Sequence, residues 1–114
     1  MEAKPPIDLT DFQRVDLRVG RIVAVEEFPE ARKPSYKLTI DFGPLGLKRS
    51  SAAIRPWYAP EDLIGRLIIA VVNLPVRRVA GFPSEVLVLG AIQPDGRVIL
   101  LQPDHPTDPG NPIA

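Results

Sequence analysis

The sequence lacks cysteine and contains a single histidine, His105. Without cysteine, disulfides, thiolate catalysis and cysteine-liganded metal sites are excluded together. His105 lies in a proline-rich segment near the end of the chain, so the common zinc sites, which need several histidine or cysteine ligands, are not expected either. We therefore expect no metal and no cofactor.

Long apolar runs are also missing. No stretch approaches the roughly 18 apolar residues that a membrane span requires. The opening segment "MEAKPPIDLTDF" has no apolar region of the kind found in secretory signals. We expect no membrane insertion and a cytoplasmic location.

Catalytic motifs are absent as well. No serine stands in a G-x-S-x-G context, and Ser50 and Ser51 have no base nearby in the sequence. The acidic pairs at 26–27 and 61–62 fit the ends of secondary-structure elements, where carboxylates favour helix starts and solubility. The protein is not expected to be an enzyme, which leaves binding as the functional class.

The charges are balanced overall but unevenly distributed. Fourteen basic and fourteen acidic residues give a formal net charge of zero. Residues 32–60, however, carry six cations against the single carboxylate of Asp41, and a local patch can steer a ligand even in a neutral molecule. The six cations are Arg32, Lys33, Lys37, Lys48, Arg49 and Arg55.

Three aromatic residues, Tyr36, Trp57 and Tyr58, stand among these cations. Cations beside aromatic rings are typical of single-stranded nucleic-acid binding, in which phosphates meet the cations and bases stack on the rings. In the alternative interpretation, Tyr36 belongs to the core and the other two rings cap the end of the fold. The patch would then act by charge alone.

The pattern of apolar residues predicts short strands. Alternation is cleanest in "YKLTIDF", where Tyr36, Leu38, Ile40 and Phe42 share one face. "VDLRVGRIVAVEEF" also alternates until Gly20, which suits a bulge or sharp coiling of a long strand. Further strands are predicted in "LKRSSAA", "RLIIAVVNL", "SEVLVLGAI" and "RVILL".

Helix is predicted at only two places. A short helix runs from about Pro60 to Ile64 and stops at Gly65, and a helical turn in residues 8–15 has Asp8 or Thr10 as its cap. From Pro103 the tail is too rich in proline for regular structure and should lie extended along a surface.

We expect one all-β domain over residues 1–114, with its core at about 12–104 and a proline-rich tail at 103–114. A helix between the third and fourth strands matches the OB arrangement, a five-stranded Greek-key barrel. N- and C-terminal extensions flank it.

Several separated blocks carry a family resemblance that covers about residues 12–104. "VDLRVGRIVAVEEFPEA", "DFG" and "PEDLIGRLIIAVVNLPVRRVAGFPSEVLVLGA" resemble the tRNA-binding domain family. "EEFPEARKPSYKLTIDFG", "SSAAI" and "PVRRVAGFPSEVLVLG" are most similar to its CsaA type, the bacterial secretion chaperones. The tRNA binders of the family carry a serine and a methionine in a shared motif. Ser84 matches the serine, but Leu87 stands at the position of the methionine, and this departure favours the CsaA type.

The resemblance implies a non-catalytic OB-fold homodimer. The CsaA type implies binding of unfolded precursor proteins before export, in partnership with the translocase ATPase SecA. The wider family implies structure-dependent tRNA binding as the alternative. A third possibility is an assembly factor that docks on an aminoacyl-tRNA synthetase.

We expect contacts to a peptide or tRNA from a charged surface and from an exposed apolar groove. The predicted contact residues are Arg32, Lys33, Lys48, Arg49, Ser51, Arg77, Arg78, Ser84 and Leu87. The predicted dimer interface comprises Ile7, Leu9, Phe12, Val79 and Phe82. Phe82 is equally compatible with a place in the peptide groove.

Overall fold

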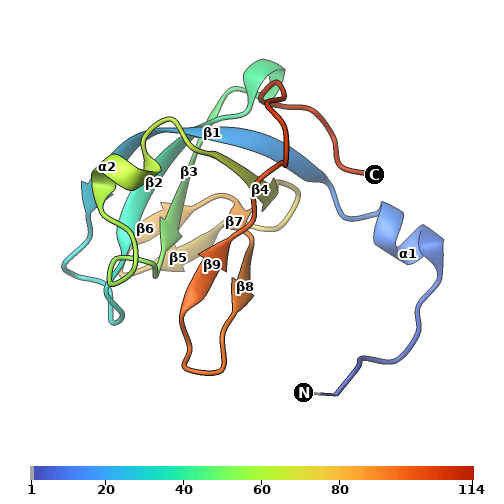
Figure 1. The fold of residues 1–114 in the computed structure, drawn as a ribbon, viewed down its shortest axis with the longest axis horizontal. Helices are drawn as coiled ribbons and strands as arrows, with labels where there is room; N and C mark the ends of the chain where they lie inside the picture. Colours follow the sequence, from blue (N-terminus) through green and yellow to red (C-terminus); the bar gives the residue numbers. More distant parts are fainter. Residues whose placement is uncertain (1) are drawn as a thin grey trace.

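The structure is a computed structural model and describes residues 2–114 (Figure 1). No helix in this range is long and apolar enough to cross a membrane. In chain order, the elements are α1 (Leu9–Gln13), β1 (Leu17–Glu27), β2 (Tyr36–Asp41), the 3-10 turn η1 (Gly43–Leu45), β3 (Leu47–Ala52), α2 (Pro60–Leu63), β4 (Leu67–Val71), β5 (Arg77–Val79), β6 (Phe82–Ser84), β7 (Leu87–Val88), β8 (Gly90–Ile92) and β9 (Val98–Leu100).

Five strands form an antiparallel sheet in the order β3-β2-β1-β4-β7, which curls into a nearly closed barrel. The two edges of this sheet approach each other where the Glu85 N–H donates to the Arg49 carbonyl at 2.8 Å, just before β7. With α2 lying between β3 and β4, this is the OB arrangement, and the predicted fold class is confirmed. Two short hairpins, β5–β6 and β8–β9, are added to the barrel.

The long strand β1 pairs with both β2 and β4, so it must coil strongly. Its register against β2 shifts between Ile22 and Ala24, which is a bulge. The bulge is therefore not at Gly20, where the sequence had allowed either a bulge or sharp coiling. The role of Gly20 is close packing, because a Cβ at this position would lie 2.6 Å from Ile40 Cγ2 and 2.7 Å from Phe42 Cε1.

The core lies inside the barrel and contains the face predicted from "YKLTIDF". Leu38, Ile40 and Phe42 are fully buried and Tyr36 is nearly so. The Tyr36 hydroxyl donates to the Tyr58 carbonyl at 2.7 Å. Burial, with the nearby Glu27 carboxylate, raises the pKa of Tyr36, so the phenol stays protonated and keeps this bond.

Both predicted helices are present. α2 starts at Pro60. Its first turn is fixed by Asp62, whose carboxylate accepts the Ala59 N–H at 3.0 Å, and Gly65, with φ +87°, follows the helix. α1 follows Asp8, which occupies the predicted cap position but makes no side-chain cap bond. α1 has no buried residue and stands away from the barrel (Figure 1).

The proline-rich tail is more ordered than predicted. It does lie extended, but it also pairs with β1, where Val19 N–H donates to Asn111 O at 3.0 Å and Ile113 N–H to Leu17 O at 2.9 Å. An antiparallel bridge joins Arg18 and Pro112. The tail thus fills the edge of the first half of β1 that β2 leaves free, because β2 pairs only with residues from Arg21 onward.

We expect Gly20→Ala to lower the free energy of unfolding by about 1–3 kcal/mol, because the added methyl overpacks the core. Urea denaturation measures the change. In a double-mutant cycle with Phe42→Leu, which removes the ring that the methyl would meet, the combined loss should be smaller than the sum of the single losses. Strict additivity would show that crowding against Phe42 is not the cause.

Candidate binding groove

A groove of about 660 Å³ lies where three distant parts of the chain meet. Residues 30–33 and Ser35 form one wall and residues 77–80 of the β5–β6 hairpin form another. Ser51 and Ala53, at and just after the end of β3, complete the lining. In Figure 1 the hairpin lies beside β3, within reach of the loop between β1 and β2.

The hairpin is held against the outer face of the barrel by aromatic packing. Phe82 packs edge-on against Phe28, with ring centroids 5.5 Å apart. Lys37 Nζ lies 4.8 Å from the Phe28 centroid and the Arg49 guanidinium lies 4.9 Å from that of Phe82. The Ser84 hydroxyl accepts the Ser51 N–H of β3 at 3.0 Å. These contacts fix the position of β5 and of the arginines on it.

The hairpin turn is tight and strained. Ala80 and Gly81 both have positive φ, 47° and 82°, which identifies the two-residue turn as type I′. Ala80 is the one non-glycine residue with positive φ among residues 2–114. A left-handed conformation costs an alanine roughly 1–2 kcal/mol, so strain is concentrated at the rim of the groove.

Four cations line the groove, Arg32 and Lys33 on the loop wall and Arg77 and Arg78 on the hairpin wall. None of the four forms an ion pair with a carboxylate in the described part of the chain. Glu30 is the single carboxylate of the lining. An excess of unpaired positive charge in a concave surface favours an anionic ligand.

A smaller hollow of about 260 Å³ adjoins the groove at Arg77, which lines both. Its other walls are mainly apolar and include Leu74, Pro75, Val86 and Leu87. The two hollows together offer a charged region and an apolar region side by side.

Five of the nine predicted contact residues line the groove: Arg32, Lys33, Ser51, Arg77 and Arg78. Leu87 lines the apolar hollow and is 42% exposed. Ser84 lines that hollow too, but it is buried and its hydroxyl is engaged with β3.

Lys48 and Arg49 lie on opposite faces of β3 and do not line the groove. Arg49 lies on the outer face of β3, packed on Phe82 and paired with Glu26 at 3.0 Å. Lys48 is its neighbour in a strand, so it points to the opposite face, in register with the core residue Ile40. The opposite orientation of these two side chains could have been predicted from the alternation of side chains along a strand.

The predicted interface residues lie in two places, the α1 arm and the β5–β6 hairpin. Ile7, Leu9 and Phe12 are 69%, 68% and 41% exposed, on and beside α1, and remain candidates for contact with a second copy. Val79 lines the groove. Phe82 is buried within one chain, so its burial needs no partner.

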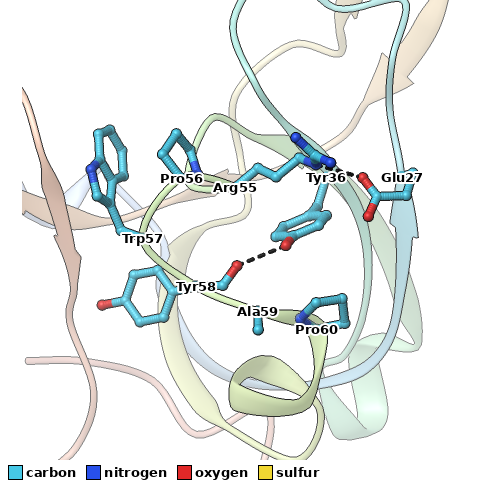
Figure 2. A pocket seen from close by; sticks show the side chains of 8 residues that line it. All are labelled: Glu27, Tyr36, Arg55, Pro56, Trp57, Tyr58, Ala59 and Pro60. Atoms are coloured by element: carbon cyan, nitrogen blue, oxygen red, sulfur yellow. Dashed lines mark hydrogen bonds and ion pairs between the residues drawn. The ribbon is translucent and has the colours of Figure 1, made fainter.

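The aromatic residues of the basic segment lie elsewhere. Trp57 and Tyr58 line a separate hollow of about 410 Å³ with Tyr36 and the Arg55–Glu27 ion pair, whose atoms are 2.7 Å apart (Figure 2). Sequence reasoning missed Phe28, whose ring supports the hairpin. The signal for it was a phenylalanine between Glu27 and Pro29 in an otherwise polar loop.

No metal centre is evident. Residues 2–114 contain no group of three or more histidine, cysteine or acidic side chains that could hold an ion. His105 is paired with Asp104 at 3.3 Å, and both side chains are almost fully exposed.

The barrel, with α2 between β3 and β4, identifies the protein as an OB-fold domain. Residues 17–112 match the model of the tRNA binding domain family, so the chain belongs to that family. Its structure is similar to that of "chaperone CsaA" from Bacillus anthracis str. Ames, with TM-score 0.92, 53% identity, and coverage of 96% of this chain and 100% of that one. It is also similar to the "CsaA chaperone protein" from Picrophilus torridus, with TM-score 0.89, 53% identity and the same coverage.

Among curated proteins, methionine–tRNA ligase 1 of Sorangium cellulosum (strain So ce56) is 46% identical over 106 residues. The match covers 93% of this chain but 15% of the ligase. The similarity therefore concerns one domain of a much longer enzyme. The resemblance to a CsaA-like member of the tRNA-binding domain family is confirmed.

We expect Ala80→Asn to raise the free energy of unfolding by about 0.5–1 kcal/mol, because Asn-Gly is a preferred type I′ sequence and asparagine tolerates positive φ. Ala80→Val is the control, since a β-branched residue is strongly disfavoured there and should destabilise. Thermal unfolding of both variants reports the changes. Shifts of the same sign would contradict a type I′ turn at this position.

Proposed function

We propose that this protein is a chaperone of the CsaA type that binds extended segments of unfolded proteins in the groove. The observation that carries the proposal is the meeting of four unpaired cations and an apolar hollow at Arg77. Such a surface suits a segment in which apolar side chains stand beside acidic ones. The likeness to two CsaA chaperones over their whole length supports it.

Within residues 2–114, the groove lacks aromatic residues, and this favours a protein ligand over single-stranded nucleic acid. Of the described residues that line the two hollows, none is aromatic, and the rings of Phe28 and Phe82, which support the hairpin, are buried. Sequence-tolerant binding of unpaired bases relies on exposed rings for stacking. The groove offers charge and apolar contact without such a platform.

The proposed location, oligomeric state and partners follow from the likeness to the two CsaA chaperones. We propose a cytoplasmic homodimer in which the exposed apolar residues of the α1 arm contact the second copy. Its clients would be unfolded precursor proteins before export, and SecA is the proposed partner. The chain is proposed to act as a single domain without catalysis.

Binding of tRNA is the second candidate, favoured by the family match and by the same four cations. In that case the contacts would be to phosphates of a folded RNA, which fix position without reading bases.

An Arg32→Ala/Arg77→Ala variant tests whether the groove binds the unfolded client. We expect a stoichiometric amount of wild-type protein to suppress aggregation of a chemically denatured client, measured by light scattering. The variant should bind that client about tenfold more weakly, a loss of about 1.4 kcal/mol. Arg97→Ala, which removes an exposed arginine outside the groove, is the matched control and should bind normally.

A salt series of gel shifts with tRNA tests the second candidate. If phosphates are contacted, log affinity falls linearly with log salt, and each lost contact lowers the slope by about one. Strong tRNA binding without any suppression of aggregation would overturn the chaperone proposal in favour of the RNA one.

A further inference from the structure

The wall of the groove formed by β5 is a strand edge. Four consecutive residues, 77–80, line the same groove. Successive side chains of a strand point to opposite faces, so a surface that includes every residue in turn runs along the backbone. β5 pairs only with β6 in the described part of the chain, and its other edge borders the groove.

The register of the hairpin determines which backbone groups face the groove. Since Ala80–Gly81 is a two-residue turn, Val79 and Phe82 form the hydrogen-bonded pair that closes it. The next pair, Arg78 and Pro83, is then a non-hydrogen-bonded pair. Proline fits there because it has no N–H to donate.

The backbone N–H and C=O of Arg78 consequently point away from β6 and toward the groove. No hydrogen bond from another described segment reaches them, while the Arg78 side chain folds back to donate to the Gly81 carbonyl at 3.2 Å. An unpaired strand edge is a template for an added strand. Here the edge is short, carries two arginines, Arg77 and Arg78, and borders a groove.

We propose that the client segment binds as an added β-strand along the free edge of β5, with the backbone of Arg78 donating and accepting the central hydrogen bonds. Main-chain bonds of this kind give affinity without demanding a sequence, while alternate side chains supply preference. The cations on both walls select acidic side chains in the client. The inference rests on the proposed function and states how the same groove captures its ligand.

The probe is a fluorescein-labelled eight-residue peptide that alternates valine and glutamate. We expect it to bind, as measured by fluorescence anisotropy. Peptides that are N-methylated at alternate amides test the mode. When the methylated amides are those that face β5, methylation removes their N–H donors and should weaken binding tenfold or more. When they are the alternate set, the methyl groups face away from β5 and the affinity should change less than twofold.

On the protein side, Arg78→Ala and Arg78→Pro form a matched pair. Both remove the guanidinium, but only proline also removes the N–H that faces the groove. An edge position of this kind tolerates proline because no bond to β6 is lost. We expect Arg78→Pro to bind the peptide at least tenfold more weakly than Arg78→Ala, with circular dichroism as the check on folding.

A second readout uses unmodified protein and does not depend on the proline variant. In hydrogen exchange followed by NMR, saturating peptide should slow exchange of the Arg78 amide at least tenfold. Peptide binding without protection of this amide, or equal weakening by methylation of either set of amides, would overturn strand addition while leaving the chaperone proposal intact. Absence of binding by any peptide, with tRNA bound, would overturn both.

Discussion

The fold depends on one long strand that must pair with two neighbours while it coils around a small core. β1 contacts β4 along its first half and β2 along its second. This is possible because Gly20 has no side chain where Ile40 and Phe42 cross it, and because a bulge follows Ile22. The barrel closes because β1 bends, and that closure positions the segments that line the groove.

The groove is one consequence of the closure. Curling of the sheet brings the loop after β1, the end of β3 and the β5–β6 hairpin to one side of the barrel. Phe28 and Phe82 then join the loop to the hairpin through a buried edge-on contact, while Lys37 and Arg49 cover the rings. The groove is thus assembled on a buried aromatic support, and the four cations that line it form no ion pair within residues 2–114.

Arg77 and Arg78 would have two physically consistent roles in the proposed binding mode. A free strand edge invites association with other copies of the chain, and a short, charged edge resists it. The same charges, set in a concave groove, attract a segment that carries acidic side chains. Under the proposed strand addition, the same pair of residues would limit self-association and favour an acidic client.

The sequence by itself determined what depends on local pattern. Strand alternation identified the core face of Tyr36, Leu38 and Ile40, proline and glycine bounded α2, and the lack of cysteine removed thiolate chemistry. All four cations that line the groove were also singled out, since residues 32 and 33 and the arginine pair stand out as charges in the sequence. Only the tertiary structure decided that these two segments face one another, that Phe28 supports the hairpin, and that the tail pairs with β1. The physical reason is that alternation is written into neighbouring residues, whereas the meeting of two loops depends on how a whole sheet curls and closes.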